Sequence, residues 1–311
     1  MKRIKSTIFV CMALLTIWSC GDSDDITGDA IEIGTDYILP QSGASATANG
    51  RITDIYNKYG SYVLYDFDQK DALWQQYTGT ASVNYFTTVT KGDFENVEKM
   101  LNFLDETWLG QMNDDFLRNG GIPYRVFLAD SIYETRFGRK YTSNMKVLGN
   151  AIILSGMNKI PTMSESNKNK YRKELLSTLW SYYKTQGILK IPDEFYSVSD
   201  YVTLPEMTYE SGWYYFEEDQ YDEFYSRGFT PLYQSYLRDW PEGSDLKKKW
   251  ASARSQDLDA YNSLIFYLSD EDMEEFLAYP LIQKKWRILL QYYKDKYGIN
   301  LRKVLGYSGD L

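Results

Sequence analysis

The 311-residue sequence contains no histidine, and its two cysteines, Cys11 and Cys20, both lie near the N-terminus. Chemistry that needs an imidazole as base, proton shuttle or metal ligand is therefore closed to this chain by itself. A disulfide framework or a cysteine-ligated zinc site in the body of the protein is excluded as well. Basic charge is also scarce, with 34 Lys and Arg against 43 Asp and Glu. A general attraction to nucleic acid or to an anionic membrane is thus not expected.

The chain has enough apolar material for a buried core, since 43% of its residues are hydrophobic and 16% are aromatic. Its length suits one large or two small globular domains, and its composition excludes disorder, collagen and coiled coil. The aromatic residues include 29 tyrosines and 8 tryptophans. Such side chains fill cores, and where exposed they stack on sugars or peptides.

The N-terminus has the form of a secretory signal. Met1–Lys5 is basic and residues 6–17 are mostly apolar, which is typical of a signal peptide. As a helix this stretch would rise about 18 Å, which is too little to cross a hydrocarbon layer of roughly 30 Å. We therefore expect a cleaved signal peptide at residues 1–19 rather than a transmembrane anchor.

Ile17-Trp18-Ser19-Cys20 resembles a lipobox, which implies cleavage before Cys20 and its modification with diacylglycerol and a further acyl chain such as palmitate. The acidic cluster Gly21–Asp25 resembles the surface-export signal of Bacteroidetes-type lipoproteins and implies display on the outer face of the outer membrane. Two or three acyl chains hold a protein on a membrane stably. The alternatives are ordinary signal cleavage and a solvated acidic linker.

Residues 20–50 are predicted to form an acidic, flexible tether, because they contain Gly, Asp, Ser and Thr but few large apolar side chains. Tyr37-Ile38-Leu39 is the one short piece expected to be ordered. Neither a comparable linker nor an internal repeat follows, so residues 51–311 are interpreted as a single domain.

Strand patterns dominate the first part of this domain and helical patterns the second. Residues 92–112 carry apolar side chains at helical spacing, and three β-branched or aromatic runs predict strands at 61–67, 124–129 and 150–155. Helices are predicted at 162–186, 219–227, 246–268, 270–278 and 281–297. This order predicts an α+β fold, with a small N-terminal mixed sheet and a helix followed by a mainly helical half.

Two of these helices carry end signals. Thr162-Met163-Ser164-Glu165 has the form of a capping box at the start of the helix 162–186. Gly298 is a natural stop for the last predicted helix.

Four stretches in order resemble the substrate-import-associated zinc metallohydrolase lipoproteins, a zinc-binding metallopeptidase family encoded beside outer-membrane nutrient importers. They are Tyr59–Phe67, Gln186 with Ile191–Tyr201, Arg227–Tyr233 and Tyr292–Leu301. The resemblance covers most of residues 51–311 and implies a zincin-like helical half. It also implies association with a TonB-dependent transporter and its SusD-like lipoprotein.

In that family the helix before Ile191 carries His-Glu-x-x-His, whose two imidazoles bind zinc while the Glu activates a water. Here the positions read Ser177, Thr178 and Ser181. A neutral hydroxyl is a poor zinc ligand, and threonine cannot act as a carboxylate base. The downstream acidic segment of the family falls near Asp259, with its expected Glu at Asn262 or Ser263. The resemblance thus implies a degenerate site without metal, cofactor or catalytic residues.

Other chemistries are less well supported. Acidic pairs such as Glu217-Glu218 and Glu274-Glu275 fit a glycosidase in principle, but in so acidic a chain they are better explained as solvated helix ends. A catalytic Ser-Lys dyad remains an alternative, although the sequence contains no Gly-x-Ser-x-Gly nucleophile elbow. Among the aromatic clusters, Trp213, Tyr214 and Tyr215 lie outside a clear helix and are the preferred ligand contacts.

The sequence therefore predicts a cell-surface, lipid-anchored pseudoenzyme of the outer membrane that assists nutrient import by binding a substrate or the importer. The sequence leaves open whether the ligand is a glycan, a peptide or a protein partner, and nucleic acid is not expected to be a partner. The alternative is a histidine-independent hydrolase that acts on glycan or peptide in the same cleft. A binding module predicts a groove without convergent carboxylates, whereas an enzyme predicts two carboxyls, or a lysine and a serine, that face one another.

Overall fold

The computed structural model describes residues 36–78, 85–230, 240–252 and 254–308. The chain divides into two units, Met1–Ile38 and Leu39–Leu311, and the helices and strands of the described residues belong to the second. The predicted signal peptide at residues 1–19, the lipidation site Cys20 and the acidic cluster 21–25 lie outside the described residues. In the part of the chain that the structure describes, no helix is both long enough and apolar enough to span a membrane.

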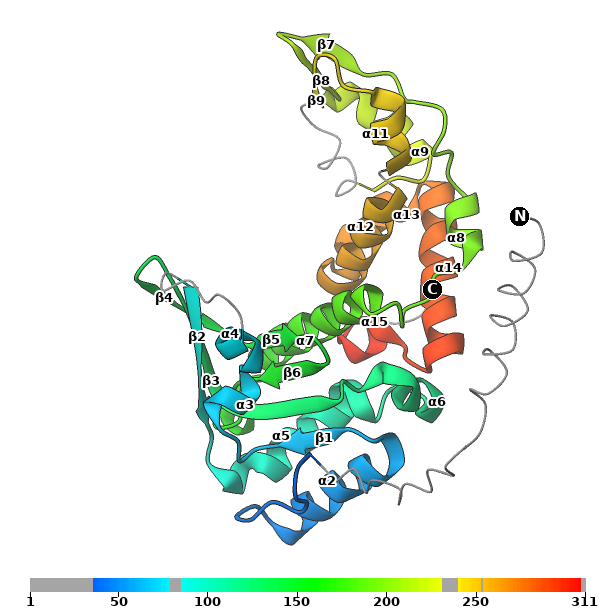
Figure 1. Ribbon diagram of the computed structural model, residues 1–311. Coiled ribbons are helices and arrows are strands. Elements are labelled where there is room, and N and C mark those ends of the chain that lie inside the picture. Colours follow the sequence, from blue (N-terminus) through cyan, green and yellow to red (C-terminus); the bar gives the residue numbers. More distant parts are fainter. Residues whose placement is uncertain (1–35, 79–84, 231–239, 253, 309–311) are drawn as a thin grey trace, which may run out of the picture. The chain divides into compact units, whose positions relative to one another are not determined.

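A six-stranded mixed sheet is built around the long strand β3 (Figure 1). β3 pairs in parallel with β1 and β6, its later residues pair antiparallel with β2 and β4, and β5 pairs antiparallel with β6. The strands are β1 (Tyr62–Leu64), β2 (Tyr85–Lys91), β3 (Arg125–Arg136), β4 (Arg139–Ser143), β5 (Met145–Leu148) and β6 (Ala151–Leu154). The three strands predicted from sequence are β1, β3 and β6, which are largely buried, whereas β4 is largely exposed and lacks that signal.

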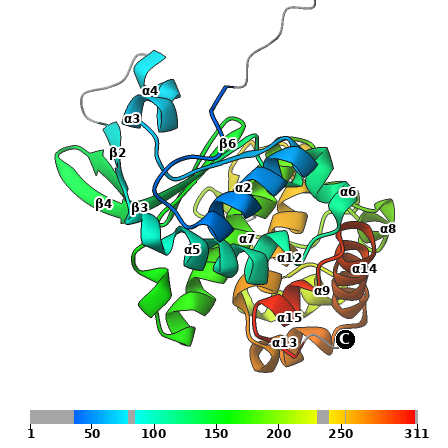
Figure 2. The ribbon, with the colours of Figure 1, turned by 90° about the horizontal axis from the view of Figure 1, so that it is seen from below.

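Helix α2 (Ala46–Tyr59) lies beside α5 (Val97–Leu104) (Figure 2). Ser45 caps α2 by accepting from the Ala48 N–H, and Ala48 and Ile52 are buried. The tether predicted for residues 20–50 therefore does not extend to Gly50, because its last residues are the first turn of a packed helix. The run of small residues looked like a spacer, yet Ala48 is small enough to fit into the core.

The predicted helix 92–112 is a succession of helical turns rather than one regular helix. Its parts are η1 (Phe94–Asn96), α5 and the π-helical η2 (Asp105–Leu109). Further short helices in this half are α3 (Gln69–Ala72), α4 (Trp74–Thr78), α6 (Asp114–Phe116), η3 (Leu117–Gly121) and η4 (Ile160–Thr162).

The long helix α7 (Glu165–Thr185) begins three residues later than its sequence signal suggested. Its N-cap is Ser164, which accepts from the Asn167 N–H, and not Thr162, which lies in η4. One side of α7 is buried and includes Tyr171, Leu175 and Leu179. The other side is open to the cavities described for the candidate site.

The second half is mainly helical, as predicted. Its helices are α8 (Asp193–Ser197), η5 (Glu218–Gln220), α9 (Tyr221–Ser226), α11 (Leu246–Ser252), α12 (Arg254–Tyr267), α13 (Asp270–Leu277), α14 (Pro280–Tyr297) and α15 (Leu301–Val304). Gly298 ends α14 with a φ of +83°. A small antiparallel sheet adds β7 (Thr208–Glu210), β8 (Trp213–Tyr215) and β9 (Trp240–Pro241).

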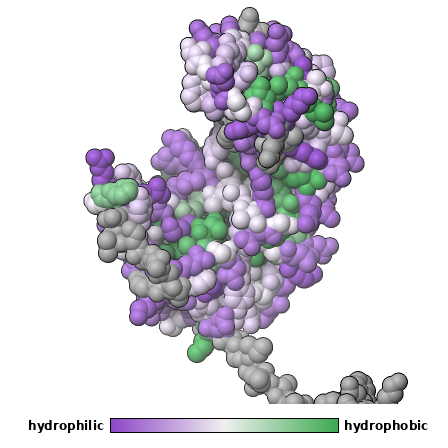
Figure 3. All heavy atoms as spheres, turned by 45° about the horizontal axis from the view of Figure 1, so that its top comes forward, coloured by the Kyte–Doolittle hydropathy of each residue, from purple (hydrophilic) through white to green (hydrophobic). Residues whose placement is uncertain are grey.

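One large hydrophobic cluster joins the two halves, since it includes Val126 and Ile152 of the sheet as well as Leu179 and Tyr293 of the helices. The α+β class is thereby confirmed. The face seen in Figure 3 is mostly hydrophilic, with hydrophobic residues in separate small groups. Because the unit Leu39–Leu311 contains the buried residues that the structure describes, it has a core of its own and is expected to fold by itself.

Candidate functional site

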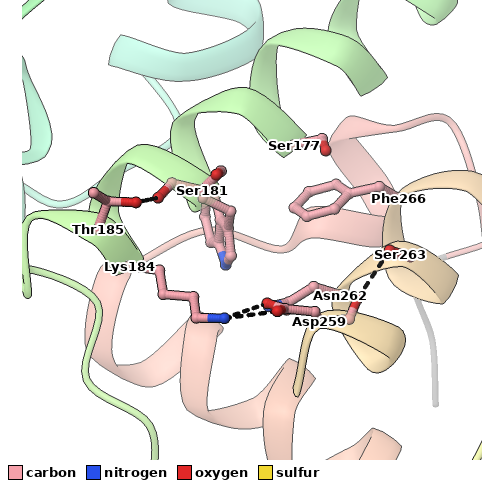
Figure 4. Close-up of a pocket in the computed structure, with 9 residues that line it drawn as sticks. Ser177, Ser181, Lys184, Thr185, Asp259, Asn262, Ser263 and Phe266 are labelled. Atoms are coloured by element: carbon pink, nitrogen blue, oxygen red, sulfur yellow. Dashed lines mark hydrogen bonds and ion pairs between the residues drawn. The ribbon is translucent and has the colours of Figure 1, made fainter. Parts of the chain in front are cut away.

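The exposed side of α7 forms one wall of a cavity of about 340 Å³ (Figure 4). Ser177, Ser181 and Thr185 lie on it at steps of four residues, which brings side chains to the same helical face. Ser177 is half-buried and Ser181 is exposed. The two serine positions therefore face open space rather than the core.

Helix α12 forms the opposite wall. It contributes Asp259, Asn262, Ser263 and Phe266, whose spacing again selects one helical face. α7 and α12 are in direct contact. The cavity thus lies between the helix that carries the predicted degenerate motif and the segment predicted to carry the family's acidic ligand.

An ion pair joins the two helices at this cavity. The Lys184 ammonium donates to both carboxylate oxygens of Asp259, at 2.6 and 2.7 Å, and the two side chains are 38% and 45% exposed. Figure 4 shows Lys184 reaching from α7 toward Asp259 on α12. Among the described residues, Asp259 is the only carboxylate that lines the cavity, and Lys184 already neutralises it.

Buried aromatic residues fix the back of the cavity. The Tyr293 hydroxyl of α14 donates to Asn262 Oδ1 at 2.8 Å, which leaves the amide nitrogen of Asn262 as its available end. Burial raises the pKa of Tyr293 far above its usual range, so this hydroxyl stays protonated and keeps its role as donor. Trp180 lines the cavity and packs edge-on against Tyr293 and Phe266.

A second cavity of about 560 Å³ shares Ser177, Ser181 and Thr185 with the first. Thr178 lines this second cavity, together with Val147 and Gly149 from the end of β5 and the turn that follows it. The exposed face of α7 is therefore common to two hollows, one toward α12 and one toward the edge strand β5.

The structure thus places the four predicted motif positions around two neighbouring cavities. Ser177, Ser181 and Asn262 line the first cavity, and Thr178 lines the second. Both alternatives for the acidic position, Asn262 and Ser263, line the first cavity. The sequence did not decide whether Asn262 or Ser263 takes the acidic position of the family. Since neither residue carries a charge, the position provides no carboxylate ligand in either case.

These residues do not fit a zinc ion. Two neutral hydroxyls are poor ligands, and the one carboxylate nearby is bound by Lys184, whose positive charge would repel a second cation. In the described ranges, no three His, Cys, Asp or Glu side chains come together as a possible metal site.

Trp213, Tyr214 and Tyr215 lie elsewhere, on β8, and line neither of the two cavities on α7. Trp213 is 46% exposed. Tyr214 packs on Tyr209, and the Tyr215 hydroxyl donates to Glu210 on the neighbouring strand. The structure therefore does not join these preferred ligand contacts to the serine positions.

Sequence reasoning missed a fully buried ion pair between α12 and α14. Lys285 of α14 donates to Asp257 of α12, to Ser199 Oγ and to the Gly228 carbonyl, and the Lys285 and Asp257 side chains are both 0% exposed. Desolvation raises the pKa of Asp257 and lowers the pKa of Lys285. The pair ties the first turns of α12, which also carry Asp259 and Asn262, to α14.

Neither a model of a known protein family nor a curated protein matches the sequence. The fold is similar to that of a crystal structure from Bacteroides caccae, described as a "putative zinc-binding metallo-peptidase", with 16% identity and a TM-score of 0.42. The similarity covers 85% of this chain and 93% of the other. At this degree of similarity no activity carries over, and the function is argued from the residues of this chain.

Proposed function

We propose that this chain is a binding protein without metal chemistry, built on a degenerate zinc-metallohydrolase-like scaffold. The observation that carries the proposal is the convergence of Ser177, Ser181 and Asn262 in one cavity. These are the positions at which the family resemblance expects zinc ligands. Their small polar side chains leave the cavity open.

The cavity chemistry favours a polar ligand without net charge. Serine hydroxyls and the Asn262 amide offer donors and acceptors, and the Lys184–Asp259 pair supplies both charges in a compensated form. Such groups suit the hydroxyls of a saccharide or the amides of a peptide. We therefore propose a neutral glycan or peptide as the ligand.

A histidine-independent hydrolase is less well supported by this arrangement. A glycosidase needs two carboxyl groups across the sugar, but Asp259 is the only carboxylate that lines the cavity in the part of the chain that the structure describes. A Ser-Lys dyad needs the lysine at the serine hydroxyl. Among the contacts of the described residues, Lys184 donates to Asp259 and none joins it to Ser177 or Ser181.

Calorimetric titration with neutral oligosaccharides and neutral peptides tests the binding function. We expect one of the two classes to bind the parent chain, and Ser181→Phe to abolish binding while the fold is kept. Binding that survives Ser181→Phe, or turnover of a bound compound by the parent chain, would contradict the proposal.

The proposed function includes a location and a partner in the cell. We propose that the mature chain is lipid-anchored through Cys20, is displayed on the outer membrane surface, and assists a TonB-dependent, SusC/SusD-like importer. Labelling with an alkyne analogue of palmitate should mark the full chain and be lost in Cys20→Ala but kept in Cys11→Ala. Detergent-solubilised outer membranes should yield a large barrel partner with the tagged chain, and repeated failure to recover one would contradict the association.

A further inference from the structure

The hairpin of β3 and β4 ends in a two-residue turn, Phe137-Gly138 (Figure 1). The last paired residues are Arg136 and Arg139. Both turn residues have positive φ angles, +48° for Phe137 and +75° for Gly138. These angles belong to a type I′ turn, which places its two central residues at the very end of a twisted ribbon.

Phe137 is an unusual occupant of this turn. The first central position favours Asn, Asp or Gly, because other side chains meet a steric penalty in the left-handed region. Phe137 is 70% exposed, and its ring touches the edge of the Tyr85 ring at a centroid distance of 4.8 Å. Since folding gains little from so exposed a ring, a strained Phe137 points to a role outside the fold.

The tip is basic although the chain is acidic overall. Arg136, Arg139 and Lys140 surround Phe137, whereas Glu134 is the one carboxylate within residues 134–141. Glu134 already binds Arg136 at 2.5 Å and Lys146 at 2.9 Å. Arg139 and Lys140 are exposed and form no ion pair with a described residue. The net charge of −9 predicts that anionic surfaces repel the chain as a whole, but this basic tip is an exception.

Two exposed tyrosines flank the tip on one face of the ribbon. Tyr85 lies opposite Arg136, and Tyr141 lies opposite Glu134. Residues that face each other across strands share a sheet face, as do residues two apart along a strand. Tyr85 and Tyr141 are 47% and 48% exposed. The ribbon thus ends in an apolar ring with cations and tyrosines around it.

We propose that this hairpin tip docks on an anionic membrane surface. Phe137 enters the boundary between headgroups and acyl chains, while Arg139 and Lys140 lie at the lipid phosphates. Aromatic rings beside Lys and Arg are typical of this depth. The inference rests on the hairpin alone and needs neither the proposed ligand cavity nor lipidation at Cys20.

A membrane fits the tip better than a protein partner does. A stable protein interface buries roughly 800 Å² on each side, whereas a two-residue turn offers one ring and its neighbours. A headgroup layer accepts such a small wedge anywhere on its surface. Screening over about 10 Å keeps distant carboxylates of the protein from cancelling the attraction at the tip.

The test uses the unit Leu39–Leu311, which holds the core, and co-sedimentation with vesicles. One set is phosphatidylcholine and the other an equal mixture of phosphatidylcholine and phosphatidylglycerol. We expect the parent unit to bind the anionic vesicles more strongly. Phe137→Asn should lower the partition coefficient about tenfold, yet keep or raise the melting temperature, because Asn suits the turn.

Charge-reversal variants distinguish the effect of the cations at the tip from the effect of the net charge of the protein. Arg139→Glu/Lys140→Glu should lower partition into anionic vesicles by at least about twentyfold. The control Lys284→Glu/Arg287→Glu changes the net charge equally at two exposed positions of α14 and should leave partition nearly unchanged.

Three results would overturn the proposal. The first is equal binding of the parent and Phe137→Asn, and the second is an equal loss in the control and the tip variants. The third is absence of binding to either vesicle by the folded parent, in which case an acidic protein partner becomes the explanation for the tip.

Discussion

Lys184 of α7 and Asp259 of α12 bind each other across the cavity, with the ammonium nitrogen 2.6 and 2.7 Å from the two carboxylate oxygens. A positive charge thus already lies in the cavity lined by Ser177 and Ser181, the positions where the family resemblance expects a metal. This charge belongs to the protein. Because the Lys184 ammonium compensates the Asp259 carboxylate, no external cation is needed to balance the charge of this carboxylate.

Asp259→Asn should change the ligand preference of the cavity more than its stability. The pair is nearly half exposed, so we expect a stability loss of at most about 1 kcal/mol. Lys184 would then lack its carboxylate and should attract acidic ligands. Calorimetry with the neutral and acidic forms of one peptide should detect a gain in affinity for the acidic form only. The control Asp193→Asn, at an exposed position of α8, should show no such gain.

Blocking the exposed face of α7 should abolish ligand binding without unfolding the chain. Ser181→Phe places a ring on the helix face shared by the two cavities, since Ser181 lines each of them, and we expect a loss of more than about tenfold in affinity. Ser166→Phe is the matched control, an exposed serine in the first turn of the same helix. If both variants bind as the parent does, the ligand lies elsewhere, and β8 with Trp213 becomes the first place to search.

Removing one member of the buried pair should destabilise the protein strongly. Lys285→Met leaves the Asp257 carboxylate buried without its cation, and such losses are about 3–5 kcal/mol. Lys285→Met/Asp257→Leu removes both charges and should recover most of that loss. Urea unfolding measures both variants, and a single variant as stable as the parent would show that the pair does not hold α12 to α14.

The stability of the sheet should depend on pH through Glu134. The Lys146 ammonium, which donates to this carboxylate, lowers the pKa of Glu134 from its ordinary 4.5. Because the folded pKa is below the unfolded one, this stabilisation is fully present above about pH 5. It is lost as the pH falls through the folded pKa.

Glu134→Gln gives the measurement of this effect. The difference in unfolding free energy between the parent and Glu134→Gln should be constant near neutral pH and shrink below pH 4.5. Glu194→Gln at an exposed position serves as control. A difference that grows on acidification would have the opposite sign and refute the assignment.

Strong local signals were enough to predict much of this fold. Buried apolar strands such as β6 can be predicted from their composition. Helices such as α7 and α14 can be predicted from the periodic spacing of their apolar residues. β4, with the sequence Arg-Lys-Tyr-Thr-Ser and mostly exposed side chains, carries no such pattern. It exists because β3 is long enough to pair with it.

The candidate site was predictable where it depends on spacing within one helix. Ser177 and Ser181 are four residues apart, and the helix alone sets them on one face. The partners Asp259 and Asn262 come from another helix, and only the resemblance suggested them. The Lys285–Asp257 pair could not be foreseen, because a single lysine among charged neighbours in a helix gives no sign that packing will bury it.

Zinc titration of a variant with two histidines on α7 shows whether this cavity can hold the metal that the family resemblance expects there. Ser177→His/Ser181→His/Lys184→Met returns two imidazoles to the face of α7 and frees the Asp259 carboxylate to be a third ligand. If this cavity is a vacated metal site, the parent chain takes up no zinc and the variant binds about one zinc per chain. A folded variant that binds no zinc, or stoichiometric zinc in the parent that Ser177→Ala/Ser181→Ala removes, would contradict the account.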